Sequence, residues 1–188
     1  MDPTLTQLKV ANRALVEIAQ GNPLTSGDVS TNFDGSQNGI YAAELYNGAA
    51  RLLLRQMDWE FARTVVTLSA SGRGPAPGWT YSYTYPTACE RLRQVIPVIT
   101  DPYDPQPIIW EVGNDGTGQV IWTNVASAEA TITTNAVTEG QWDDIFTEQM
   151  VRYLGSLLSM PVAGRPDFSK EMLNIAGNIG TAGMDRDS

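Results

Sequence analysis

The stretch Asp58-Trp59-Glu60-Phe61-Ala62, followed after a loop by residues 79–86 (Trp-Thr-Tyr-Ser-Tyr-Thr-Tyr-Pro), decides the fold of this chain. The first part closes a long amphipathic segment with helical periodicity. The second part alternates aromatic and small polar residues, as a strand with its aromatic side chains on one face does. We therefore expect a helical layer to give way to a sheet between these two stretches.

Two helices are predicted before this point. The first spans about residues 4–20, with Thr4 and Gln7 at capping-box spacing and a stop at Gly21-Asn22-Pro23. The second spans about residues 37–58. Its apolar stripe is expected to contain Ile40, Ala43, Tyr46, Ala49, Ala50, Leu53, Leu54 and Met57.

The polar side of the second helix carries three charged residues. Arg51 and Arg55 are one helical turn apart, and Asp58 follows after one further turn. This pattern is typical of a solvated charged face, and it is also compatible with a contact between subunits. We keep Arg51, Arg55 and Asp58 as candidate subunit contacts.

A β lobe is predicted over about residues 64–134. Its first segment, 64–69, is β-branched, and residues 71–78 are rich in glycine and proline, which predicts a flexible hairpin tip. Asn114-Asp115-Gly116 suits a tight hairpin turn, and Asp101-Pro102 and Asp104-Pro105 also indicate turns. The further strands are expected near Trp79–Tyr85, Arg93–Thr100, Ile108–Val112, Gln119–Thr123 and Glu129–Thr134.

Helical periodicity resumes over about residues 141–160 and is expected to end at Pro161. A weaker helix over about 167–178 leads into a polar, glycine-rich tail. We therefore expect an α+β fold in which the terminal helices form a small bundle with an inserted antiparallel β lobe. Residues 1–160 would form a single domain, and residues 161–188 a separate C-terminal segment.

Composition narrows the possible functions of the 188-residue chain. Apolar residues make up 42% and charged residues 18%, and no apolar run approaches the length of a membrane span. The start lacks the features of a secretory signal, so we expect synthesis and use in the cytosol. The net charge of −9 disfavours tight DNA binding; it either keeps the protein soluble or repels DNA that slides past.

Catalytic and metal chemistry find little support in the sequence. The chain has no histidine and one cysteine, Cys89, which we expect to be a small buried apolar group. We expect no enzyme activity, cofactor or metal. A glycosidase is a rival: of Asp143, Asp144 and Glu148, the pair Asp144 and Glu148 shares a helix face, although carboxylates at a helix start are explained by the helix dipole.

Five tryptophans and seven tyrosines leave a second alternative open. Aromatic side chains stack on the apolar faces of sugars, so the chain could be a carbohydrate-binding module of a virion or cell surface. Trp59, Trp79, Trp110, Trp122 and Trp142 lie at predicted element ends or on strands, which favours core or subunit contacts.

The order of the aromatic motifs, from Leu5 to Pro161, carries a family resemblance. The residues that carry it are Trp59, Phe61, Ala62, Tyr81, Tyr83, Tyr85, Pro86, Cys89, Arg91, Trp142 and Phe146. With an alanine-rich strand near residues 126–134, this order resembles the tail tubular protein A family, the head-to-tail adaptors of podoviruses. The chain departs from the family where Ala88 precedes Cys89, because an aspartate is frequent there.

The resemblance implies a structural role at the head-to-tail junction of a virion assembled in the host cytoplasm. About twelve copies would form an oligomeric ring beneath the portal protein, offer a platform to the tail nozzle protein, and let duplex DNA pass without specific binding. No membrane would be involved. Candidate portal contacts in the C-terminal segment are Asp167, Phe168, Met172, Ile175 and Ile179.

Overall fold

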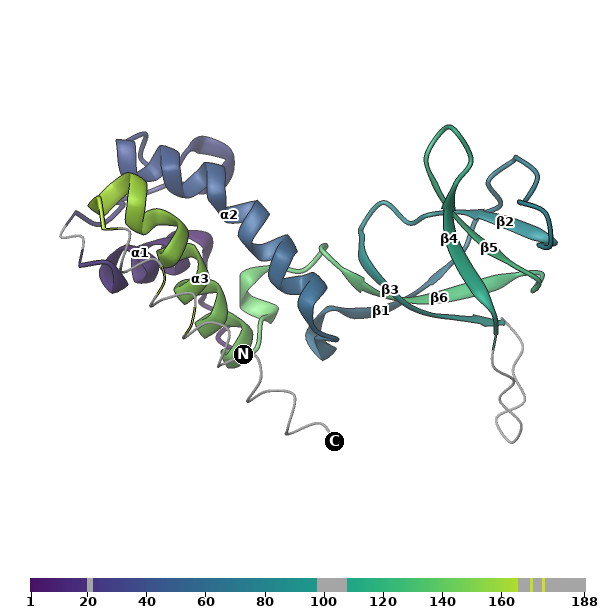
Figure 1. Cartoon of the computed structure of the whole chain (residues 1–188). Coiled ribbons are helices and arrows are strands. Elements are labelled where there is room, and N and C mark those ends of the chain that lie inside the picture. Colours follow the sequence, from purple (N-terminus) through teal and green to yellow (C-terminus); the bar gives the residue numbers. More distant parts are fainter. Residues whose placement is uncertain (20–21, 98–107, 166–169, 171–173, 175–188) are drawn as a thin grey trace. The chain divides into compact units, whose positions relative to one another are not determined.

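Helices come from the two ends of the chain and strands from its middle in the computed structural model (Figure 1). The structure describes residues 1–19, 22–97, 108–165, 170 and 174. Over these residues it contains three α-helices and six antiparallel strands, so the predicted α+β class is confirmed. The chain divides into a helical unit, Met1–Gln56 with Val137–Ser188, and a strand unit, Met57–Ala136.

Helix α1 spans Gln7–Glu17 and begins later than predicted. Its cap is Thr6, whose hydroxyl accepts a hydrogen bond from the Lys9 N–H at 3.3 Å. The predicted cap, Thr4, instead donates its hydroxyl to Asp2 at 2.7 Å. Two threonines two residues apart offer the same capping chemistry, and the one nearer the apolar periodicity caps the helix.

Helix α2 spans Gln37–Gln56 after a short 3₁₀ helix, η1, at Val29–Thr31. Most of its predicted apolar stripe is buried, including Tyr46 and Leu53. Ile40 is an exception, because 40% of it is exposed and Gly39 faces the interior instead. A Cβ at position 39 would lie 2.8 Å from the Asn32 carbonyl oxygen, so this close approach of the loop requires glycine.

Helix α3 spans Asp144–Ala163 and follows a 3₁₀ helix, η3, at Glu139–Gln141. The prediction that Pro161 ends this helix is wrong, because Pro161 lies inside its last turn. Proline removes only one hydrogen bond there, and the helix ends where Gly164 adopts a left-handed conformation with φ 64°. The Gly164 N–H donates to the Met160 carbonyl at 3.1 Å.

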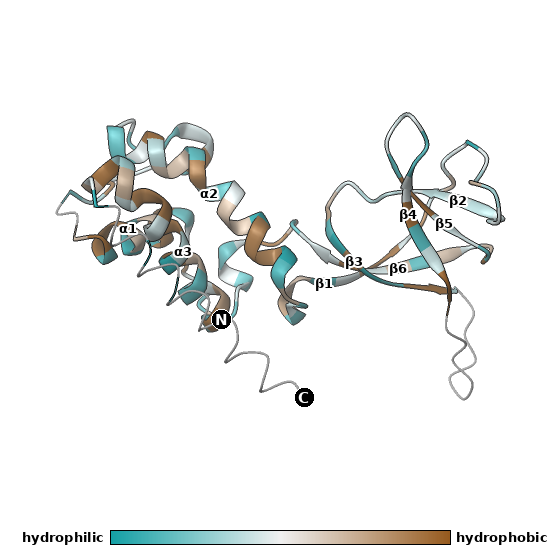
Figure 2. Cartoon of the chain, viewed as in Figure 1, coloured by the Kyte–Doolittle hydropathy of each residue, from teal (hydrophilic) through white to brown (hydrophobic). Residues whose placement is uncertain are grey.

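Helix α3 packs against both α1 and α2. Apolar and polar residues alternate along these helices (Figure 2), so each presents an apolar side to the shared core and a polar side to solvent. The side chains of Leu15, Phe146 and Leu154 are almost fully buried in this unit. Two ion pairs, Arg13 with Glu148 and Arg152 with Glu17, connect α1 to α3 along its sides.

The strand unit contains two three-stranded sheets. The first has the order β1-β6-β3 and the second β2-β5-β4. The strands span Arg63–Thr67 (β1), Tyr81–Thr84 (β2), Cys89–Pro97 (β3), Trp110–Asn114 (β4), Gln119–Thr123 (β5) and Ala128–Thr134 (β6).

Most of these strands match their predicted positions. β5 has the predicted bounds, and the predicted hairpin turn connects β4 to β5, with Gly116 at φ 88°. β3 begins four residues earlier than predicted, at Cys89 instead of Arg93. Its predicted last residues, 98–100, and the turns at Asp101-Pro102 and Asp104-Pro105 lie outside the described residues.

One hydrophobic core serves both sheets of the strand unit. Ile121 from β5 meets Val95 from β3 and Ile132 from β6, and Leu68 and Tyr83 are buried in the same cluster. The six short strands therefore form one cooperative unit. Within the described residues, no helix is both long enough and apolar enough to span a bilayer.

Candidate functional site

The first motif lies at the start of the strand unit. Trp59 and Ala62 are buried, and a short 3₁₀ helix, η2, spans Glu60–Ala62. The side chains of Trp59 and Phe61 lie 5.9 Å apart between ring centroids. This motif therefore anchors the segment that leads into β1, and its residues are packing residues rather than a binding surface.

Arg93 holds this motif against the sheet, although the sequence did not single it out. Only 8% of its side chain is exposed. Its guanidinium donates to the Trp59 carbonyl at 2.6 Å and to the Thr133 hydroxyl at 2.9 Å. It also forms ion pairs with Asp58 at 3.5 Å and with Glu60 at 3.7 Å, while burial lowers the pKa of Arg93.

The neighbouring motif residue Arg91 plays a smaller part. It lies on the exposed side of β3 and pairs with Asp58 at 3.4 Å. Arg91 and Arg93 are two positions apart on one strand, so the sequence alone does not separate them. The difference is that Arg93 meets η2 and β6, which are distant in sequence.

The tyrosine motif forms β2 and the turn that follows it. Tyr83 is buried and donates its hydroxyl to the Val125 carbonyl at 2.9 Å, whereas Tyr81 is exposed and stacks on Tyr83 at 6.4 Å. Pro86 accepts the Cys89 N–H at 3.1 Å, and the Cys89 thiol donates to the Tyr85 hydroxyl at 3.3 Å. Cys89 is buried, as predicted.

Trp142 and Phe146 belong to the helical unit. Trp142 stacks on Tyr46 at 6.4 Å and meets Phe146 edge-on at 4.8 Å. The Tyr46 hydroxyl donates to Glu139 at 3.2 Å, and burial followed by the nearby Glu139 carboxylate raises the pKa of Tyr46. These aromatic side chains fix η3 and the start of α3 against α2.

The candidate subunit contacts do not share one helix face. Arg51 and Arg55 are exposed on α2, but α2 ends at Gln56. Asp58 lies beyond that end and pairs with Arg91 and Arg93 of the strand unit. The prediction that Asp58 continues the helix is therefore wrong. The candidate portal contacts Asp167, Phe168, Met172, Ile175 and Ile179 lie outside the described residues.

The three carboxylates at the start of α3 have separate roles. Asp143 is the N-cap and accepts the Phe146 N–H at 2.6 Å. Asp144 points into solvent, with 91% of its side chain exposed. Glu148 is held in its ion pair with Arg13. Capping and ion pairing account for Asp143 and Glu148 without catalysis.

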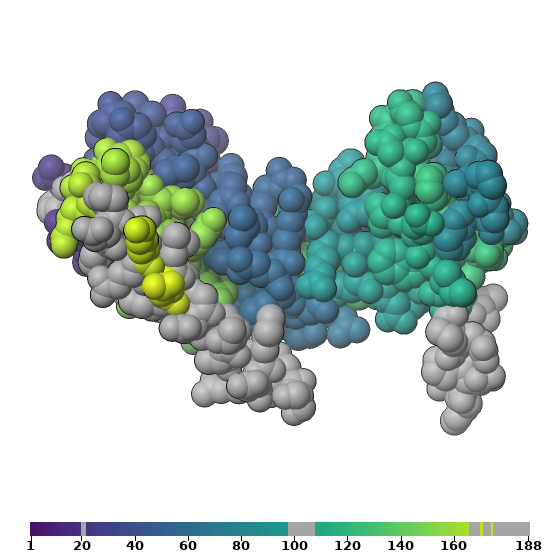
Figure 3. Space-filling view, in the orientation of Figure 1, coloured from purple at the N-terminus to yellow at the C-terminus, as the bar shows by residue number. Residues whose placement is uncertain are grey.

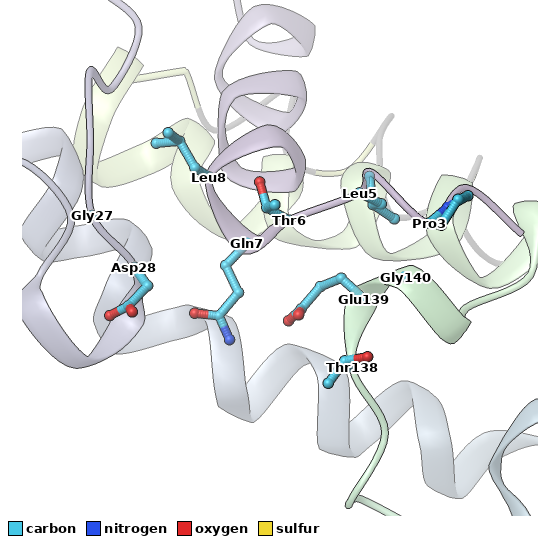
Figure 4. Close-up of a pocket in the computed structure, with 10 residues that line it drawn as sticks. All are labelled: Pro3, Leu5, Thr6, Gln7, Leu8, Gly27, Asp28, Thr138, Glu139 and Gly140. Atoms are coloured by element: carbon cyan, nitrogen blue, oxygen red, sulfur yellow. The ribbon is translucent and has the colours of Figure 1, made fainter.

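A groove of about 570 Å³ lies in the helical unit between the start of α1, the segment at Gly27 and Asp28, and η3 (Figure 4). Its amide and carboxylate side chains are those of Gln7, Asp28 and Glu139. Each already has internal partners: Gln7 accepts the Val29 N–H at 3.0 Å, Asp28 caps η1, and Glu139 accepts from Tyr46. These side chains therefore hold the segments around the groove together.

Large apolar side chains are exposed on both units. In the helical unit, 69% of Val16 is exposed, and a long part of α2 (blue) lies at the surface in Figure 3. In the strand unit, 52% of Val65 on β1 is exposed. Over the part of the chain that the structure describes, the other exposed large apolar residues are Met1, Ile40, Leu52 and Met160 in the helical unit and Tyr81, Ile109 and Val112 in the strand unit.

Among the described residues, histidine, cysteine and carboxylate side chains form no cluster of three or more that could hold a metal ion. No protein-family model matches the chain, and no curated protein matches it in sequence.

Proposed function

We propose that this protein is a structural head-to-tail adaptor of a short-tailed phage, and that copies of it form an oligomeric ring between the portal and the tail nozzle. In this proposal the terminal helices are the bundle of the adaptor and the strand unit is its inserted lobe. The motif order described above supports the assignment. The portal protein and the tail nozzle protein are proposed as partners because of the resemblance to the tail tubular protein A family.

One observation carries the ring proposal: exposed apolar side chains occur on each of the two units. A closed ring needs two different complementary patches on every subunit, because each subunit contacts its two neighbours through different surfaces. In this proposal Val16 on the helical unit and Val65 on the strand unit belong to these two patches. A heterologous interface requires two separate surfaces of this kind on every subunit.

The charge of the chain supports a DNA channel without specific binding. The chain has twelve basic and twenty-one acidic residues, so it can neutralise few DNA phosphates. The packing roles of the motif residues support a structural protein over an enzyme. The C-terminal segment is proposed as the part that binds the portal, with Phe168, Met172, Ile175 and Ile179 as its apolar contacts.

Native mass spectrometry and negative-stain microscopy of the purified protein, alone and mixed with a portal ring, test this proposal. We expect oligomeric rings, or a complex of two stacked rings when the portal is present. A protein that stays monomeric under both conditions would contradict the adaptor function. Truncation after Gly164 then tests the segment, because unchanged attachment to the portal would exclude it as the docking element.

A further inference from the structure

A shallow cleft of about 650 Å³ lies in the strand unit, between residues 73–76 and the turn that connects β4 to β5. Both connections are visible in Figure 1, before β2 and next to β4. Arg73 joins the two walls, because its guanidinium donates to the Asp115 carbonyl at 3.0 Å. This hydrogen bond holds the two walls of the cleft in place relative to each other.

Trp122 on β5 lines this cleft and rests against the backbone of Gly113 on β4. A Cβ at position 113 would lie 2.2 Å from two carbons of the indole, so the ring occupies the space that any other residue would fill. The indole N–H is shielded and has no acceptor in the described part of the chain. A phenylalanine would avoid this cost, so the stability of the fold does not explain the indole.

The polar groups of the walls carry opposite charges. Arg73 provides a guanidinium and Asp115 a carboxylate, and Asn114 adds a side-chain amide. Hydrogen bonds from Thr117, first its hydroxyl and then its N–H, lower the pKa of Asp115, so this carboxylate is ionised at neutral pH. One positive and one negative group leave these walls without a net charge that would favour an anion or a cation, and they offer donors and acceptors to a neutral ligand.

We propose that this cleft binds a neutral sugar unit of a glycan. The apolar C–H face of the sugar packs on the indole of Trp122, and its hydroxyls bond to Arg73 and Asp115. Hydroxyls both donate and accept, which matches a guanidinium beside a carboxylate. The site does not depend on ring formation, and it gives the strand unit a binding role in addition to assembly.

The test uses the full-length protein on an array of neutral and acidic glycans, with saturation-transfer NMR on the glycans it retains. We expect a neutral glycan to be retained and its ring C–H protons to receive the strongest saturation from the protein. Retention of acidic glycans only, equal displacement by inorganic phosphate, or no retained glycan would overturn the proposal.

Variants place the binding at this cleft. Arg73→Ala, an exposed loop substitution, should weaken binding about tenfold or more, because it removes a charged hydrogen-bond donor. Gly113→Ala should abolish binding by displacing the indole, and Trp122→Phe should weaken it while the fold stays intact. Arg63→Ala, which removes an exposed arginine from β1 of the same unit, is the matched control and should bind as the unchanged protein does. Equal affinity of the Arg73→Ala and unchanged proteins would refute the assignment.

Discussion

Arg93 links several parts of the strand unit through polar contacts. Its buried guanidinium connects the Trp59 carbonyl, the Thr133 hydroxyl and two carboxylates. The carboxylates are more than half exposed, so water screens the ion pairs and the hydrogen bonds contribute most. Arg93 therefore acts chiefly as a buried donor that holds the aromatic motif in place.

Replacing Arg93 with alanine should lower the free energy of unfolding by about 1.5–3 kcal/mol, because it removes a charged donor from buried acceptors. Urea unfolding followed by tryptophan fluorescence measures the change. Arg91→Ala is the matched control, since Arg91 is exposed on the same strand and shares the Asp58 partner. Its cost should stay within about 0.5 kcal/mol. Equal costs for the two variants would show that burial of Arg93 has no special effect.

Helix α3 depends on its N-cap. The Asp143 carboxylate accepts the Phe146 N–H at 2.6 Å and also faces the positive end of the helix dipole. Asp143→Ala should therefore reduce stability by about 1 kcal/mol, with a range of about 0.5–2 kcal/mol. Thermal unfolding measures this. Asp144→Ala, one residue away and exposed, is the control and should cost much less.

The connection between α1 and α2 should make stability depend on acidic pH. Hydrogen bonds, first from the Ser36 hydroxyl and then from the Thr25 and Ser36 N–H groups, lower the pKa of Asp34 from 3.8 to about 2. The folded state therefore favours the ionised carboxylate. This stabilisation is fully present above pH 3.8 and is lost as pH falls toward 2.

Asp34→Ala tests this dependence. The melting temperature of the variant should be lower than that of the unchanged protein near neutral pH, and the gap should shrink as pH falls toward 2. Glu44→Ala, which removes an exposed carboxylate from α2, should show no such narrowing. A gap that stays constant with pH would mean that the Asp34 hydrogen bonds do not favour its charged form.

Local patterns predicted the elements better than their ends. The bounds of β5 followed from a short β-branched and aromatic run between turn signals, and the hairpin turn before it from Asp115-Gly116. The end of α3 was wrong because Pro161 is tolerated in a last turn, and the start of α1 because two threonines competed as caps. Asp58 was misplaced, and Arg93 was not singled out, for another reason: their partners are brought together by strand pairing, which periodicity does not reveal.

At the scale of the whole molecule, substitutions of the exposed apolar side chains can distinguish a heterologous subunit interface from a symmetric one. Val16 of the helical unit and Val65 of the strand unit are exposed valines, so Val16→Asp and Val65→Asp are matched changes. Neither should unfold the protein, because both residues are more than half exposed. Each should block ring closure by placing a charge in an otherwise apolar contact.

A mixture of the two variants gives the sharper result. Each variant keeps the patch that the other has lost. A heterologous interface therefore allows one intact contact between the two variants, and no further subunit can be added. Native mass spectrometry should then find monomers in each separate sample and a one-to-one heterodimer in the mixture. A symmetric interface, in which one patch meets its own copy, would instead leave homodimers of at least one variant. Rings that persist in both variants would place the subunit contact elsewhere on the protein.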